Sequence, residues 1–188
     1  MVGSQNTLSG NSNVLTGNLN QVNGNLNQVS GNVNAILGSA NQIAGNSNNV
    51  QGDSNKLKGS NNAISGNLNQ VSGNFNTASG SENKIKGSSN IVDGSHNAME
   101  GSSNAVSGNN NSMIGSKNVV KGDTNSILGS ENKLSGSNNA VSGDKNNVAG
   151  SGNQILGGSN DVNGINSYID GEFNSINDWF DFDWSSLF

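Results

Sequence analysis

Asparagine is the residue of this sequence whose type and spacing could do chemistry. The chain has 188 residues, and an Asn follows each repeated Gly by three positions, from Asn6 to Asn174, with Ser167 as the single exception. An amide side chain donates two hydrogen bonds and accepts two, so copies of it at fixed spacing can bond to one another. The pattern indicates an array of hydrogen bonds rather than a reaction centre.

The groups that usually catalyse reactions are scattered singly. His96 is the only His, and its neighbours one double repeat away are Glu82 and Asn110. The sequence has no Cys, which excludes disulfides and thiolate metal sites. No general base accompanies the Ser residues, no calcium-repeat pattern is present, and the Gly-rich turns lack the Lys-Ser/Thr of a phosphate-binding loop. We therefore expect no enzyme, no metal and no cofactor.

Charge and hydropathy limit the partners. The net charge is −5 with only eight cationic side chains, all of them Lys, whereas a nucleic-acid binder usually has a basic face rich in Arg. No apolar run approaches the roughly 20 residues of a membrane span. The first ten residues, MVGSQNTLSG, lack the charged and apolar regions of a secretory signal peptide. We expect neither nucleic-acid binding nor a membrane span.

The sequence is a tandem repeat of seven residues. Gly recurs at every seventh position from Gly3 to Gly171, and only two of the 27 glycines fall outside this series. An apolar residue follows each of these glycines by five positions, so the unit is G-[SN]-x-N-x-[VIL]-x. A coiled coil needs two apolar positions per heptad. A Gly in every second turn would also cost a helix about 1 kcal/mol each time. A long helix is therefore excluded.

The spacing inside the unit predicts a strand. Asn and the apolar residue are two positions apart and share one face, while the residues four and six after Gly point outward. Gly and its polar follower make the turn, because Gly adopts positive φ without steric cost. Two units form a coil with two short, flat faces made of five-residue strands, and about 12 coils stacked at ~4.8 Å form a rod on the order of 60 Å long. Ladders of Val, Ile and Leu, flanked by ladders of Asn, fill the interior.

We therefore predict an all-β, two-faced β-solenoid with about 14 residues per coil over residues 1–163. Residues 164–188 are predicted to hold the last, degenerate repeats and an aromatic C-terminal cap.

The repeats SENKIKG, SSNAVSG and SNNAVSG resemble the xxNxVxG unit of the antifreeze and ice-recrystallisation-inhibition proteins of cold-tolerant grasses. The resemblance covers about Gly3 to Ile176. It implies a left-handed β-roll, a flat ice-binding face and an extracellular location. The repeats are less similar to the head repeats of trimeric autotransporter adhesins, which also alternate a small apolar residue and Gly.

One predicted face carries candidate residues for binding ice or another flat, repetitive surface. The grass proteins fill the position before the core residue with Thr, but here only Thr7 and Thr77 do so, and charged residues interrupt both faces. A solvated wall is the alternative interpretation. The candidates are the small outward residues Thr7, Ser9, Ala63, Ser65, Thr77, Ser79, Ala105 and Ser107.

Exposed apolar positions indicate a second function, a self-assembling structural or adhesive protein acting as a filament subunit or rigid spacer. It would use an open N-terminal end, the corners and the tail. Corner residues two after Gly either tuck under the turn or contact another subunit. The candidates for assembly are Leu19, Val33 and Phe75 on one corner, Leu26 and Leu68 on the other, and Ile114, Leu128 and Leu156 on the second face. That face also carries Lys56, Lys58, Lys84 and Lys86, which either keep a flat sheet soluble or bind an anionic surface.

The C-terminal tail concentrates the aromatic residues. Three interpretations stay open: a cap on the last coil, a docking segment for a partner, or a C-terminal export signal. The location is accordingly either extracellular or cytoplasmic. The tail candidates are Trp179, Phe180, Phe182, Trp184 and Phe188.

Overall fold

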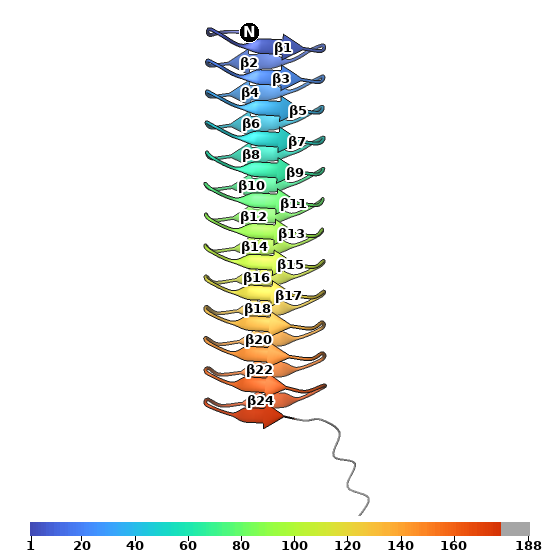
Figure 1. The fold of residues 1–188 in the computed structure, drawn as a ribbon, viewed down its shortest axis with the longest axis vertical. Coiled ribbons are helices and arrows are strands. Elements are labelled where there is room, and N and C mark those ends of the chain that lie inside the picture. The colour runs from blue at the N-terminus through green and yellow to red at the C-terminus, as the bar shows by residue number, and fades with distance from the viewer. Residues whose placement is uncertain (178–188) are drawn as a thin grey trace, which may run out of the picture.

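The computed structural model describes residues 1–177, which form a straight stack of coils (Figure 1). Every regular element among these residues is a β-strand. Each strand pairs in parallel with the strand 14 residues further along, for example Thr77 with Ile91. This confirms the predicted all-β solenoid of paired heptads.

Two sheets run the length of the stack, one on each side. The odd sheet has 13 strands and the even sheet has 12, because consecutive strands alternate between them. The odd sheet contains β1 (Thr7–Ser9), β3 (Gln21–Asn23), β5 (Ala35–Leu37), β7 (Asn49–Gln51), β9 (Ala63–Ser65), β11 (Thr77–Ser79), β13 (Ile91–Asp93), β15 (Ala105–Ser107), β17 (Val119–Lys121), β19 (Lys133–Ser135), β21 (Asn147–Ala149), β23 (Asp161–Asn163) and β25 (Ser175–Asn177). The even sheet contains β2 (Val14–Thr16), β4 (Gln28–Ser30), β6 (Gln42–Ala44), β8 (Lys56–Lys58), β10 (Gln70–Ser72), β12 (Lys84–Lys86), β14 (Ala98–Glu100), β16 (Ser112–Ile114), β18 (Ser126–Leu128), β20 (Ala140–Ser142), β22 (Gln154–Leu156) and β24 (Tyr168–Asp170).

The strands are three residues long, so the expected five-residue strand is wrong. The reason lies in the Asn that precedes each strand. The backbone N–H of Asn76 donates to the side-chain Oδ1 of Asn62 at 2.9 Å, not to a backbone carbonyl. The ladder of backbone bonds therefore starts one residue later, and Gly80 (φ +117°) ends it.

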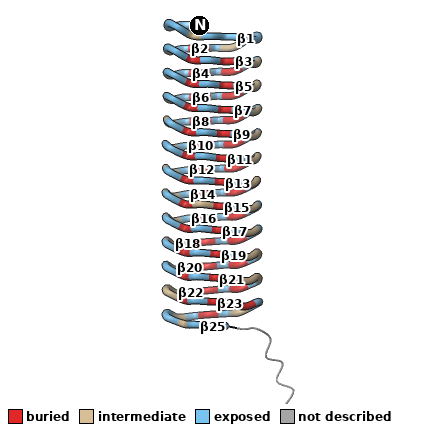
Figure 2. The backbone as a smooth tube through the Cα atoms, in the orientation of Figure 1, coloured by how far each residue is buried: buried red, intermediate tan, exposed pale blue. Residues whose placement is uncertain are grey.

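The interior consists of one apolar residue and one Asn from each repeat. Figure 2 shows these buried positions recurring along the stack, from β2 to β24. From Leu15 to Ile169, the apolar residues five positions after each repeated Gly are at most 4% exposed, which confirms the predicted apolar ladders.

The Asn ladders are confirmed as well, and a central amide such as that of Asn76 is fully bonded. Asn76 donates from Nδ2 to Asn62 Oδ1 at 3.1 Å and to the carbonyl oxygen of Gly87 at 2.9 Å. Its own Oδ1 accepts from the backbone N–H and from Nδ2 of Asn90, both at 3.1 Å. Buried amides without such partners would each cost about 1–3 kcal/mol, so the ladder holds the coils in register.

The ladder beneath the even sheet ends earlier than its counterpart. Ser167 occupies the place of the next Asn, and its backbone N–H donates to Asn153 Oδ1 at 2.9 Å. Its hydroxyl oxygen is buried without a hydrogen-bond partner. Beneath the odd sheet the amides continue to Asn174, which donates to Asn160.

The corners need Gly for two reasons. Gly80 has positive φ, as predicted, and a Cβ there would also overlap the carbonyl oxygen of Gly94 in the next coil. The residue two positions after each repeated Gly also has a left-handed backbone conformation, with φ between +56° and +62° whenever it is not Gly.

Of the two interpretations of the apolar corner residues, burial under the turn is wrong, and contact with another subunit stays a prediction. Each of these residues is more than half exposed to solvent: Leu19 is 54%, Leu26 65%, Val33 52%, Leu68 54% and Phe75 64% exposed.

Candidate functional site

Each sheet presents two rows of outward side chains. The rows come from the residues before and after the core residue, which lie about 7 Å apart along a strand, and successive strands are ~4.8 Å apart. Because every strand has the same register, the outward atoms form a regular, rigid lattice on each side of the rod.

The odd sheet is free of charge over its first six strands. From β1 to β11 its outward residues are Thr, Ser, Gln, Asn, Ala and Leu, and the first charged one is Asp93 on β13. The whole chain up to Gly52 contains no ionisable side chain. We call the outward residues of β1 to β11 the uncharged face.

The structure brings four of the eight predicted surface residues together. Ala63 and Ser65 on β9 lie directly beside Thr77 and Ser79 on β11. These four side chains, with Asn49 and Gln51 of β7, line a shallow trough along the sheet.

The other four lie on the same sheet but apart. Thr7 and Ser9 form β1, at the far end of the uncharged face. Ala105 and Ser107 form β15, beyond Ile91 and Asp93 of β13. Their roles in binding stay predictions.

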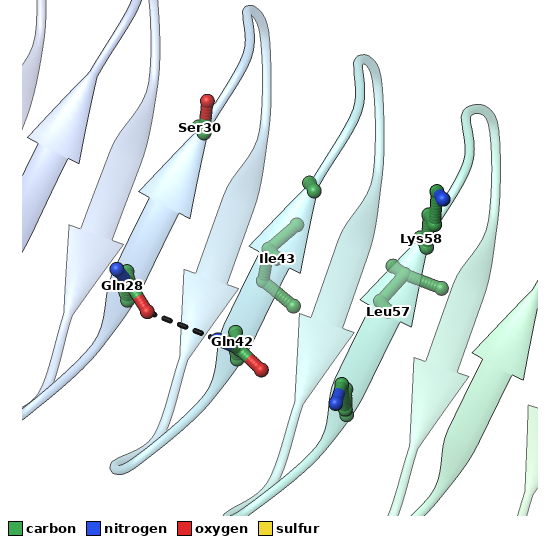
Figure 3. Close-up of a pocket in the computed structure, with 8 residues that line it drawn as sticks. Gln28, Ser30, Gln42, Ile43, Leu57 and Lys58 are labelled. Carbon is green, nitrogen blue, oxygen red and sulfur yellow. Dashed lines mark hydrogen bonds between the residues drawn. The ribbon is translucent and has the colours of Figure 1, made fainter.

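The even sheet has the same geometry and different chemistry. Figure 3 shows Gln28 and Gln42 on neighbouring strands, joined by a hydrogen bond of 3.1 Å from Gln42 Nε2 to Gln28 Oε1. Leu57 lies on the buried side of β8, and Lys58 projects outward from the same strand. Between β6 and β8 the outward residues of the even sheet therefore change from Gln42 and Ala44 to Lys56 and Lys58.

The candidate apolar edge of the even sheet is only partly continuous. Ile114 and Leu128 are neighbours on β16 and β18, and each is more than half exposed. Leu156 is only partly exposed, and Ser142 separates it from Leu128. The remaining assembly candidates, Trp179, Phe180, Phe182, Trp184 and Phe188, lie outside the described residues, as does the predicted cap.

Sequence reasoning missed a second polar ladder on the outside of the corners. From Asn18 to Ser151, the residue directly after each repeated Gly accepts, through its side-chain oxygen, a hydrogen bond from the equivalent backbone N–H in the preceding coil. Asp53 Oδ1 accepts from the N–H of Ser39, and Asp123 Oδ1 from that of Asn109, both at 2.6 Å. The signal was the restriction of this position, up to Ser151, to Ser, Asn and Asp, the short side chains that carry an acceptor.

Residues 1–177 lack two further features. They contain no group of three or more His, Asp and Glu side chains able to hold a metal ion. They also contain no helix with the length and apolar character needed to cross a bilayer.

Comparison with known proteins identifies the family. The model of the grass antifreeze beta roll matches residues 1–101 and again residues 85–179. The chain therefore belongs to the grass antifreeze beta roll family, a non-enzymatic kind of protein, as the repeat unit predicted. No curated protein matches the sequence. The match does not favour the alternative of a structural or adhesive protein.

Proposed function

We propose that the protein binds ice and inhibits its recrystallisation, and that the uncharged face is the surface in contact with ice. Two observations support the proposal: membership of the grass antifreeze beta roll family, and six consecutive strands of the odd sheet without an outward charge. The run of six uncharged strands identifies the face and is the main support for the proposal.

The order of the uncharged face and the hydration of its side chains both favour contact with ice. An ice surface is a regular array of water molecules, and a stacked parallel sheet offers hydrogen-bonding groups at equally regular intervals. Short side chains such as Ser65 and Thr77 can hold ordered water without losing much conformational entropy. Lysine side chains are long, mobile and strongly hydrated, so they would keep ice away from the backbone.

The interior contributes rigidity. Interior amides and backbone bonds tie each coil to the next, so the spacing of Ala63 and Thr77 is held by the whole stack. A preorganised surface of this kind does not have to be ordered at the moment of binding.

An ice-recrystallisation assay at micromolar concentration tests the proposal. The native chain should arrest crystal growth, while an unrelated protein of equal net charge should not. Ala63→Lys on the uncharged face should weaken inhibition about tenfold. Ala140→Lys makes the same change at the same position of an even-sheet strand and should leave inhibition within about twofold, as expected for a site outside the interface.

Coarsening of ice in the presence of the native chain, as in the control, would refute an ice-binding function. Inhibition that Ala140→Lys weakens as much as Ala63→Lys would refute the choice of face.

A further inference from the structure

Half of the chain's cations lie in one place. Lys56 and Lys58 on β8, with Lys84 and Lys86 on β12, are four of the eight Lys and Arg residues of a protein with net charge −5. All four project outward from the even sheet around a trough that crosses Gln70 and Ser72 on β10. We call them the lysine quartet.

The quartet is only partly neutralised. Lys86 Nζ lies 2.6 Å from Glu100 Oε1 on β14. Among residues 1–177, the other three lysines form no ion pair, and the intervening strand β10 carries no acid. Like charges at this spacing repel one another, about 7 Å apart along a strand and about 10 Å apart across two strand steps. An anionic occupant would relieve that repulsion.

The chain contains a segment with matching chemistry outside the described residues. Residues 178–188, DWFDFDWSSLF, contain three Asp and no cation. Asp181 and Asp183 are two positions apart, as are the lysines of each quartet strand. The aromatic residues between the acids could pack on the lysine stems and interact with the ammonium groups. We propose that this acidic aromatic segment docks on the lysine quartet of a second copy of the chain.

The distance along the rod excludes docking on the same copy. Six strand steps separate β24 from β12 along the even sheet, or about 29 Å at ~4.8 Å per step. Asp183 follows Asn177 by six positions, so a fully extended chain carries it at most about 21 Å. The acids of one copy therefore reach only another copy's quartet.

In an antiparallel dimer, the acidic segment of each copy can contact the lysine quartet of the other. If their C-terminal ends overlap by about 29 Å, each segment lies beside the partner's quartet and the pair closes on itself. The expected assembly is a dimer whose stability depends on ionic strength.

Sedimentation equilibrium of the full chain, from low to high micromolar concentration, tests the inference. The native chain should approach twice its monomer mass in dilute buffer and dissociate as salt is added. Changing Lys56, Lys58, Lys84 and Lys86 together to Gln should weaken the dimer at least about tenfold, as should changing Asp178, Asp181 and Asp183 to Asn, because either change removes every charge pair.

The chain offers a matched control. Changing Lys117, Lys121, Lys133 and Lys145 to Gln removes the same charge elsewhere and should leave the dimer unchanged. A monomer at all concentrations overturns the proposal, including the case in which the quartet instead binds an anionic polymer or membrane. A dimer that survives the quartet change, or that the control weakens equally, overturns it as well.

Discussion

The odd and even sheets share one backbone design and differ in what they show to solvent. Both consist of three-residue parallel strands in the same register, each above an apolar row and an Asn ladder. Over the first six strands, however, the odd sheet is uncharged, whereas the even sheet carries the lysine quartet. The inward positions therefore specify this fold, and the outward positions are free to vary with function.

Removing one buried Asn beneath each sheet should have the greatest effect on stability. It tests whether the two interiors stabilise the protein equally. Asn76→Ala beneath the odd sheet leaves the Gly87 carbonyl and two donors of Asn90 without partners. Asn83→Ala does the same beneath the even sheet. We expect each change to destabilise the protein by about 3 kcal/mol and to lower the Tm by about 6–12 °C in thermal unfolding.

Asn49→Ala serves as the control, because Asn49 is exposed on the odd sheet and outside the ladder. Its Tm should stay near that of the native chain. A large loss from Asn76→Ala with little loss from Asn83→Ala would break the equivalence of the two interiors.

A smaller effect follows from the one difference between the ladders. Ser167→Asn would extend the even ladder by one amide donating to Asn153 and would remove an unpaired hydroxyl. We expect a gain of about 1 kcal/mol, seen as roughly fivefold slower amide hydrogen exchange in the last two coils. Ser175→Asn on the exposed side of β25 should not slow exchange, and unchanged protection in Ser167→Asn would show that the ladder adds nothing at this end.

The smallest effect concerns the charge that separates the two faces. If lysine is what keeps ice from the even sheet, changing the quartet to Thr gives that sheet six uncharged strands of its own, from β2 to β12. Recrystallisation inhibition should then rise about twofold, because two independent faces contribute additively. Changing the corner residues Lys117 and Lys145 to Thr should not raise it. If the quartet variant inhibits recrystallisation no more than the native chain, charge is not what distinguishes the two faces.

Much of the fold could be predicted because its geometry restricts the residue types. The corner at Gly80 excludes a Cβ on both conformational and steric grounds, and Asn76 must bond to its neighbours when buried. Such requirements repeat in every coil and therefore appear in the sequence as a period. The left-handed residue two after Gly was missed because Leu, Val and Phe, which rarely adopt positive φ, occupy it in several coils.

The candidate site was harder to predict because folding does not restrict it. Nothing in the stack distinguishes Ala63 from Ala140, since both precede a core residue and both are exposed. The pairing of Ala63 with Thr77 followed from the period. The period also gives the order of the outward residues from Thr7 to Ser79, but no requirement of the fold keeps them uncharged.

Adsorption to ice by the two faces is the most direct test of the account. Ala63→Lys with Thr77→Lys places two lysines on neighbouring strands of the uncharged face, and Ala140→Lys with Ser126→Lys places two on neighbouring strands of the even sheet. The fraction of each protein taken up by slowly growing ice would be measured beside the native chain. If the uncharged face binds ice, the first variant is excluded from ice, whereas the second is taken up like the native protein. Equal uptake of both variants, or loss of the second alone, would contradict it.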